Sequence, residues 1–419
     1  MNKTLTIHPT PSPSPYRGGE YEGRSIPLLW RGAFHHCTPL LWRGAFHHGT
    51  PLLWRGAFHH CTPLLWRGAF HHCTPLLWRG GARGGVIKLF FLFLTLLSST
   101  SCIDEQEHSD TPQGNFEALW QIIDEHYCFF DYKQINWNDI YNIYKVRANN
   151  NINDEQLFEV LTDMLSELRD GHVNLYTAFD NGRYWRWFED YPTNFSDTLQ
   201  RRYLGTDYRI AGGLRYRILD DNIGYVYYPS FTSPIGESNL DEVIQHLMFC
   251  QGMILDIRGN GGGTLTYAEK LAARFCNEKT LVGYMQHKTG KGHNDFSAEE
   301  PQYIEPSSNL RWQKPVVLLT NRGVFSAANE FTKYMMCFPQ VTVVGDQTGG
   351  GSGLPFTATL PNGWTVRFSA CPSYDRNHLQ TEFGLQPDHQ VSLTMEDFLR
   401  GRDTIIEYAR ELITTPLLL

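Results

Sequence analysis

The sequence predicts an α/β protein built on a mostly parallel sheet, preceded by a small helical subdomain. Three observations lead to this fold class. Apolar residues recur every three or four positions between residues 115 and 168, as in amphipathic helices. From residue 223 onward, short apolar runs alternate with helical patterns, which implies crossover connections between parallel strands. Glycine-rich turns follow two of these runs, at the strand ends where active sites of such sheets lie.

The first 85 residues do not follow this pattern. Five copies of a 12-residue unit, "PLLWRGAFHHCT" with small variations, run from Pro27 to Gly80. This period matches no solenoid repeat. The paired histidines and cysteines could form a metal-binding tract, and the tryptophans a propeller, but we favour neither. Residues 1–85 are interpreted as a disordered leader or as a repeat translated from a start codon set too early.

A secretory signal is predicted over residues 86–102. Lys88 precedes an apolar run from Leu89 to Leu97 that is too short to span a bilayer stably, and small residues then lead to Cys102. This pattern resembles a bacterial lipoprotein signal, which would make Cys102 the lipidated first residue. The acidic residues that follow resemble the surface-export signal of Bacteroidetes lipoproteins. The resemblance implies a protein of the cell envelope, lipid-anchored to the outer membrane, with residues 103–114 as a tether.

The charge balance argues against nucleic acid as a partner. The first 102 residues hold 10 of the 36 Lys+Arg and 2 of the 44 Asp+Glu, which leaves 26 and 42 and a net charge of −16 beyond them. An acidic domain without a basic stripe has little means of displacing counterions from a nucleic acid. The remaining cysteines are odd in number, far apart and mostly in apolar surroundings, which favours buried thiols over disulfides. They are Cys128, Cys250, Cys276, Cys337 and Cys371.

The helical subdomain is predicted over residues 115–177, with Asn153 or Asp154 capping its second helical segment. It ends in the turn "LRDGH" and a strand at Val173–Thr177. Residues 178–221 are aromatic and irregular, and the patch from Trp185 to Tyr191 is interpreted as packing more readily than as a binding platform. Residues 178–419 are expected to form the main domain. Its strands are predicted at residues 223–231, 252–259, 315–320, 341–345 and 364–369, and its helices at 239–249, 267–275 and after Ser326.

Ser326 stands at the most informative junction, between the apolar strand "PVVLLT" and the helical segment "SAANEFTKYMMCF". A serine at a strand-to-helix turn can be a nucleophile beside the free N–H groups of the helix. It can equally be an ordinary N-cap. The loop "GNGGGT" at Gly259–Thr264 could offer amides to an anion, or be a plain tight turn. It lacks the spacing of phosphate-binding and dinucleotide-binding loops.

Several motifs together resemble the C-terminal processing (tail-specific) and tricorn-type serine peptidases. These are "ILDIRGNGGG", "TNRGVFSAANEF", "VVGDQTGGGSG" and "FGLQPDHQV", preceded by the helical segment that ends in "LRDGH". The resemblance covers residues 115–413 and implies a crotonase-like fold. Many relatives insert a PDZ domain before the catalytic sheet, but the 44 residues from Ala178 to Asp221 are too few for one. Substrate selection is therefore expected within the cleft, with the aromatic patch as one contributor.

The resemblance assigns a role to each candidate site residue. Ser326 is the nucleophile, and the amides of Ala327 and Gly262 form the oxyanion hole. The C-terminal processing branch uses a lysine base in a "TxGKG" loop, but Gly351 stands at that position here. The tricorn branch uses a histidine, which corresponds to His172, and a near-neutral imidazole suits the role.

A carboxylate should orient the imidazole. The resemblance assigns Glu382 to this role, and Asp170 is a rival. Gly171 replaces the serine that precedes the histidine in the tricorn-type tetrad, and Asn329 replaces a glutamate usual in the family.

The predicted function is therefore that of a serine peptidase that acts on peptides or proteins and requires no cofactor or metal. The first alternative is a non-catalytic protein that binds a peptide or an apolar ligand on the same fold. A second alternative is an esterase or amidase. The sequence leaves the substrate and the oligomeric state open.

Overall fold

The computed structural model describes residues 108–189 and 191–415, so the predicted leader, the signal and Cys102 lie outside the described residues. The helical segment begins with α2 (Pro112–His126), α3 (Phe130–Lys133), α4 (Trp137–Tyr144) and α5 (Asp154–Ser166). Asn153 caps α5 by a reciprocal capping box with Gln156, which settles the choice between Asn153 and Asp154. Four helices therefore form where the three-to-four spacing predicted helical structure.

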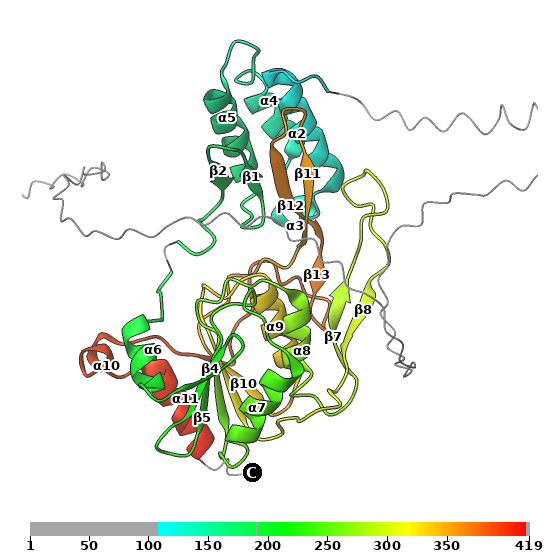
Figure 1. Ribbon diagram of the computed structural model, residues 1–419. Coiled ribbons are helices and arrows are strands. Elements are labelled where there is room, and N and C mark those ends of the chain that lie inside the picture. The colour runs from blue at the N-terminus through cyan, green and yellow to red at the C-terminus, as the bar shows by residue number, and fades with distance from the viewer. Residues whose placement is uncertain (1–107, 190, 416–419) are drawn as a thin grey trace, which may run out of the picture. The chain divides into compact units, whose positions relative to one another are not determined.

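Two distant parts of the chain share the core of this subdomain. The strands β1 (Asn174–Tyr176) and β2 (Asn181–Arg183) join β11 (Leu354–Thr359) and β12 (Thr365–Cys371) in an antiparallel sheet of order β11-β12-β1-β2. Buried side chains of β12 pack with those of α2 and α5, and Figure 1 shows β11 and β12 beside these helices. The predicted end of the helical subdomain at residue 177 is therefore wrong, because β1 pairs with β12, a strand some 190 residues later in the chain.

A seven-stranded sheet forms the centre of the main domain, in the order β14-β10-β9-β6-β5-β4-β3. The five strands from β14 to β5 run parallel, β4 pairs antiparallel with β5, and β3 pairs antiparallel with β4. The prediction of a mostly parallel sheet is therefore confirmed. The strands are β3 (Arg209–Ala211), β4 (Leu214–Ile218), β5 (Gly224–Tyr227), β6 (Met253–Asp256), β9 (Val316–Thr320), β10 (Val341–Gly345) and β14 (His389–Gln390).

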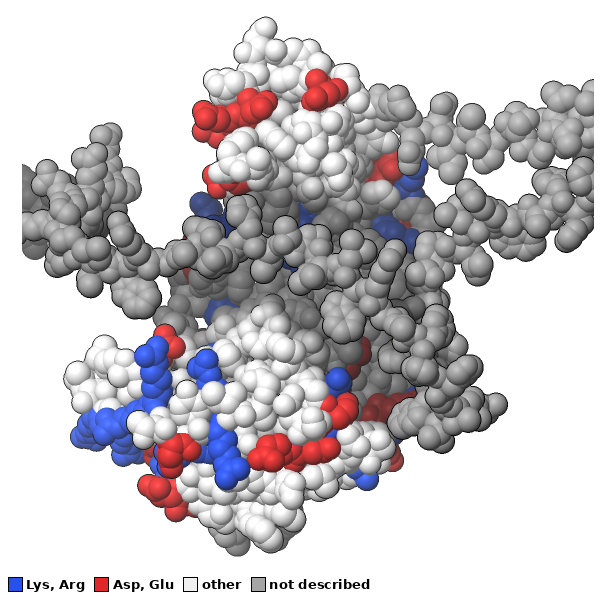
Figure 2. Space-filling model, in the orientation of Figure 1, with Lys and Arg blue, Asp and Glu red and all other residues white. Residues whose placement is uncertain are grey.

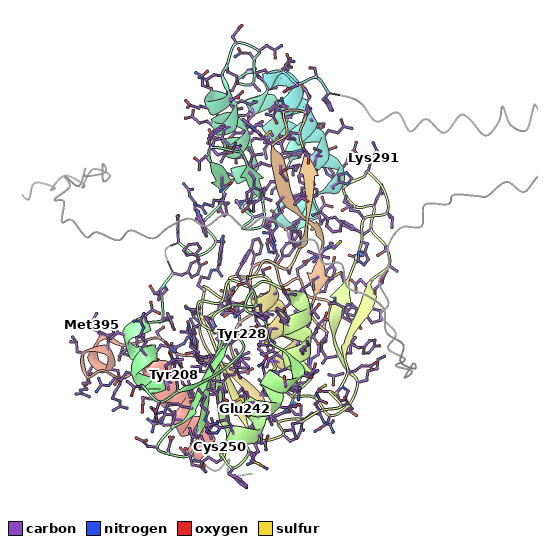
Figure 3. All side chains as sticks on the ribbon, viewed as in Figure 1. Tyr208, Tyr228, Glu242, Cys250, Lys291 and Met395 are labelled. Carbon is purple, nitrogen blue, oxygen red and sulfur yellow. The ribbon has the colours of Figure 1, made fainter. Side chains whose placement is uncertain are left out.

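Helices cover both faces of this sheet. On one face, α7 (Glu237–Leu247), α8 (Leu265–Ala272) and α9 (Ala327–Met335) pack through a large apolar cluster. On the other face, α11 (Thr404–Thr414) contacts β6, β9 and β10, and a buried leucine of α6 (Asp197–Leu204) belongs to a second apolar cluster together with α11. Side chains fill the space between the sheet and the helices (Figure 3). The short α10 (Met395–Leu399) precedes α11, and β13 (Ser373–Tyr374), β7 (Thr280–Met285) and β8 (Glu300–Ile304) form a third sheet.

A buried ion cluster fixes the carboxyl end of β6. The Arg258 guanidinium donates to both carboxylate oxygens of Asp256, at 2.9 and 2.7 Å, and to Asp403 at 3.0 and 3.1 Å. All three side chains are completely buried. Because Asp403 also caps α11, this cluster ties that helix to the strand that precedes the glycine loop.

Four of the five described cysteines are buried and all five are unpaired, in agreement with the predicted buried thiols. Among the described residues, the helices are too short or too polar to cross a membrane.

Candidate active site

Ser326 lies at the turn between β9 and α9, in a conformation that few serines adopt. Its φ is +58°, in the left-handed region that is costly for any residue with a Cβ atom. The backbone N–H of Ser326 donates to the Gly350 carbonyl at 2.9 Å. Its side chain makes no capping hydrogen bond to α9. The hydroxyl is therefore free of the N-cap role that the sequence left open.

The structure brings His172 to this hydroxyl across 154 residues of sequence. His172 Nε2 lies 2.9 Å from Ser326 Oγ, which is the geometry of a hydroxyl donating to a neutral imidazole. The loop before β1 holds the histidine, because the Asp170 carboxylate accepts the backbone N–H of His172 at 2.8 Å. The ring of Phe325 lies against the imidazole, with 4.8 Å between the ring centroids.

His172 is only 2% exposed. Burial lowers the pKa of His172 to about 4, with the Asp170 charge opposing the change and the Arg367 charge adding to it. The imidazole is therefore neutral at physiological pH, which is the state that can accept a proton from Ser326.

Neither carboxylate proposed from the sequence makes a hydrogen bond to the imidazole ring. Glu382 Oε1 instead accepts from Lys133 Nζ at 2.8 Å, and Glu382 Oε2 accepts from the Ser352 amide at 2.9 Å. Asp170 accepts a hydrogen bond from the backbone N–H of His172 rather than from its ring. His172 Nδ1 has no hydrogen-bond partner of ordinary geometry among the described residues. Gly171 has no side chain that could bridge Glu382 to the ring, which gives a physical reason for the separation.

Lys133 was not predicted from the sequence, and it links the two carboxylates. Its ammonium lies 2.8 Å from Glu382 and 3.3 Å from Asp170, with all three side chains buried. Burial raises the pKa of the Glu382 carboxyl to about 7, since the ammonium that opposes this rise is shared with Asp170. Against the effect of burial, Lys133 lowers the pKa of Asp170. The sequence "FDYKQ" around this lysine has no motif that would have identified it.

Two glycines approach the nucleophile from the loop after β6. A Cβ atom on Gly262 would lie 2.8 Å from the Ser326 Cβ and 2.9 Å from the Ala327 amide, so only glycine fits there. The Gly262 amide, however, donates to Asn260 Oδ1 at 2.9 Å. Gly263 lines the cavity beside Ser326, together with Ala327. Ala327 occupies the first helical position, where an N–H has no intrahelical acceptor.

Gly351 shows why a lysine base has no place in this site. Its φ is +76°, and a Cβ atom there would lie 2.4 Å from the Phe325 ring. A lysine at this position would combine backbone strain with a steric clash. Phe325 is held on its other side by Trp187, whose ring stacks on it with 4.2 Å between centroids. The aromatic patch therefore packs, at Trp187, against the residue that precedes Ser326.

A cavity of about 220 Å³ opens beside the Ser326 hydroxyl and the His172 ring. It combines apolar side chains with one residue of each charge. Its lining includes Leu265, Met285, Glu330, Leu354, Pro355 and Arg367. No group of three or more His, Cys, Asp or Glu residues suited to a metal ion occurs within residues 108–189 and 191–415. The arrangement is suited to acyl transfer onto a serine, with the imidazole as the proton acceptor.

Comparisons with known proteins point to one group. The family model described as "Peptidase family S41" matches residues 222–391, and the model described as "Tricorn protease C1 domain" matches residues 108–166. The crystal structure of a candidate peptidase from Parabacteroides merdae is 53% identical, with a TM-score of 0.71 over 73% of this chain and 98% of that one.

More distant proteins agree in fold or in part of the sequence. The carboxy-terminal-processing protease of Bartonella bacilliformis is 24% identical over 46% of this chain and 44% of its own. The corresponding protease CtpA of Bacillus subtilis is 25% identical over 36% of this chain and 30% of its own. The chain thus spans less than half the length of these curated relatives. Mature CPAF shares the fold, at 12% identity and a TM-score of 0.56 over 73% of this chain and 96% of that one.

Proposed function

This chain belongs to peptidase family S41, and on that premise we propose that it is a serine peptidase that hydrolyses peptide bonds through an acyl-enzyme on Ser326. The observation that carries the proposal is the distance of 2.9 Å between Ser326 Oγ and His172 Nε2. The comparisons favour this function over the non-catalytic alternative, because the curated relatives are named as proteases.

The proposed reaction has two halves, formation of an acyl-enzyme on Ser326 and its hydrolysis, and His172 transfers protons in both. Ser326 Oγ attacks the carbonyl carbon of the scissile bond while His172 accepts the hydroxyl proton. The Ala327 amide, with a glycine amide of the loop after β6, stabilises the oxyanion. His172 then gives its proton to the leaving amine, which leaves an ester on Ser326. Water, deprotonated by His172, attacks this ester, and the second oxyanion collapses to release the acid and restore the hydroxyl.

The geometry supports the Ala327 amide as a donor to the oxyanion more directly than it supports the Gly262 amide. The first-turn position of Ala327 leaves its N–H available. Gly262 fits the position predicted from the family, but its N–H donates to Asn260. Gly263 lines the cavity, and the neighbouring Thr264 amide, rather than that of Gly263, donates to Phe231. We therefore propose Gly263 as the second donor when Gly262 keeps its bond to Asn260.

Hydrolysis of a mixed peptide library by purified protein that begins at residue 103 tests this function. We expect cleavage that is lost in Ser326→Ala and in His172→Ala, while Ser238→Ala, on the exposed first turn of α7, retains it. Equal cleavage by the wild type and Ser326→Ala would contradict the proposed nucleophile. Hydrolysis of small esters without any peptide cleavage would favour the esterase alternative.

We also propose that Cys102 carries a lipid anchor and that the protein resides in the cell envelope, at the outer membrane. The signal-like sequence from Val86 to Cys102 supports this localisation. On the face shown in Figure 2, acidic side chains lie on the helical subdomain at the top, and basic side chains gather at the lower left of the main domain, with acidic side chains beside them. Metabolic labelling with a palmitate analogue should mark the wild type and not Cys102→Ala, and labelling of both would contradict the anchor site.

A further inference from the structure

A second cavity, of about 270 Å³, is lined mainly by arginines. Residues of α6, β4 and α11 form its walls, together with the turn between α10 and α11. Among the described residues of its lining, Asp220 is acidic and five residues are basic: Arg202, Arg217, Arg400, Arg402 and Arg410. A neighbouring cavity shares Arg202 and adds Arg201 and Arg215. None of these arginines lines the cavity beside Ser326.

This concentration of positive charge is unexpected in an acidic protein. Beyond residue 102, the 26 Lys+Arg are outnumbered by 42 Asp+Glu. Figure 2 shows basic side chains gathered on the part of the main domain where Figure 1 places α6 and α10. Guanidinium groups repel one another, so such a cluster costs stability unless an anion lies among them. The cluster therefore favours a negatively charged ligand.

Three of the five arginines are balanced by carboxylates that hold them in place. The pairs are Arg217 with Asp207 at 3.4 Å, Arg400 with Glu396 at 2.8 Å, and Arg410 with Asp221 at 2.7 Å. The walls are also joined to each other, because the Tyr203 hydroxyl of α6 donates to Glu407 of α11 at 2.6 Å. The cavity is therefore a fixed feature of the fold, and its surplus positive charge lies on the other two arginines.

Arg202 and Arg402 have guanidinium donors to spare. Arg402 lies 3.7 Å from Glu407 and 3.8 Å from Asp397, which is too far for ordinary hydrogen bonds. Arg202 is exposed and forms no ion pair in the described part of the chain. A Cβ atom on Gly401 would overlap the Arg202 guanidinium, so Arg202 lies against the turn that carries Arg402. Two cations from separate elements therefore meet at one cavity with free donors.

The chemistry of these two groups favours a phosphoryl ligand. A guanidinium presents its N–H groups in a planar fork that matches the oxygens of a phosphate. A phosphate monoester carries a charge of about −1.5 to −2 at pH 7, which suits two neighbouring cations. Because Arg202 and Arg402 are both exposed, the rest of a larger ligand would remain outside the cavity.

We propose that Arg202 and Arg402 bind a phosphoryl group in this cavity. The group belongs either to a soluble phosphate compound or to a phospholipid head group, because both present the same oxygens to the arginines. This site is separate from the proposed peptidase site, and its existence does not depend on the peptidase function.

Calorimetric titration with inorganic phosphate tests the site in protein that begins at residue 103 and so lacks the proposed anchor. The wild type should bind phosphate saturably, and it should bind succinate, a dianion without a phosphoryl group, much more weakly. Binding of phosphate should be roughly 10- to 100-fold weaker when Arg202→Gln and Arg402→Gln are combined. Arg147→Gln combined with Arg183→Gln is the matched control, because it removes two exposed arginines of the helical subdomain. Circular dichroism of each variant verifies that it is folded.

Co-sedimentation with vesicles distinguishes the two sources of the phosphoryl group. Phosphatidic acid in phosphatidylcholine vesicles should retain the wild type and the control variant, but not the Arg202 and Arg402 variant, when the ligand is a lipid. Phosphate binding without retention on these vesicles would assign a soluble compound instead. Equal affinity for succinate and phosphate would overturn the phosphoryl group as the ligand. Binding of neither probe, or equal binding by the folded Arg202 and Arg402 variant, would overturn the site.

Discussion

Two buried ion clusters of this molecule share one charge pattern and differ in the residue that supplies the cation. Each holds one cation between two carboxylates, Arg258 with Asp256 and Asp403, and Lys133 with Asp170 and Glu382. The guanidinium satisfies its carboxylates with several parallel hydrogen bonds, within the core of the main domain. The ammonium offers a single point charge to both of its partners, and it connects α3 to the loop of His172.

The difference suggests a division between stability and function. An arginine with bidentate contacts fixes strand, loop and helix in one arrangement. A lysine shared by two carboxylates leaves one of them able to take up a proton, and Glu382 is that group because burial raises its pKa to about 7. We therefore expect the Arg258 cluster to dominate the free energy of unfolding and the Lys133 cluster to affect the reaction.

The largest effect on stability is expected from Arg258→Met. The change leaves Asp256 and Asp403 buried without their cation, and it should lower the free energy of unfolding by about 3–5 kcal/mol. Urea denaturation followed by circular dichroism measures this value. Arg209→Met is the matched control, because the Arg209 and Glu242 side chains are 55% and 52% exposed. Its effect should stay within about 1 kcal/mol. Equal effects of both changes would contradict the stabilising role of the buried Arg258 cluster.

Lys133→Met should destabilise the protein less and slow the reaction more. Protonation of Glu382 can relieve part of the lost charge pairing, so we expect a loss of about 1–3 kcal/mol. Because Asp170 holds the His172 backbone, loosening of this loop should lower kcat/KM roughly 10- to 100-fold. Lys145→Met, at an exposed position just after α4, provides the control. A Lys133→Met variant with unchanged kcat/KM would show that this cluster is only structural.

The pH dependence of kcat/KM tests the buried state of His172. Since its pKa is lowered to about 4, the base remains neutral at acidities that would protonate an ordinary histidine. The acid limb of kcat/KM should therefore fall near pH 4 rather than near 6.5. Arg367→Met should move this limb to higher pH, because Arg367 disfavours the imidazolium. A wild-type limb at pH 6.5 would contradict the burial of the base.

The same pKa has a consequence for stability. The unfolded histidine binds a proton more readily than the folded one, so the contribution to stability is complete above pH 6.5 and is lost as the pH falls toward 4. The difference between 6.5 and about 4 corresponds to a loss of about 3 kcal/mol at most. Thermal unfolding of wild type and His172→Ala between pH 4 and 7 should converge toward low pH.

Glu382→Gln is expected to change the stability with the opposite pH trend. The pKa of Glu382 is higher in the folded state than in the unfolded state, so this carboxyl favours folding at low pH and costs stability as the pH rises from 4.5 through about 7. Glutamine does not titrate. The variant should therefore gain stability relative to the wild type, by about 1–3 kcal/mol, between pH 5 and pH 8. A difference that does not change with pH would place the Glu382 pKa near its ordinary value.

Much of the main domain could be predicted from the sequence, because the patterns that indicate its strands and helices are local. Apolar runs at residues 252–259, 315–320 and 341–345 correspond to β6, β9 and β10, and the helices that follow β6 and β9 begin within a few residues of their predicted starts. Ser326 and His172 were identified from turns and from a family resemblance, and the structure brings them together. Their meeting depends on the sheet order, which periodicity alone does not contain.

Other features depend on tertiary contacts that leave no local pattern. The stretch 178–221 appeared irregular, yet it contains β2, α6, β3 and β4. Their strands are three to five residues long, which is too short for a clear alternation. Lys133 is one polar residue in an aromatic stretch, and its importance comes from Asp170 and Glu382, which are distant in sequence.

The most direct measurement is mass spectrometry of the protein from residue 103 onward after treatment with a fluorophosphonate, which modifies activated serines. The account predicts a single adduct on Ser326, absent from His172→Ala and formed more slowly in Lys133→Met. A folded wild-type protein whose Ser326 remains unmodified would contradict it and favour a protein that binds peptides without cleaving them.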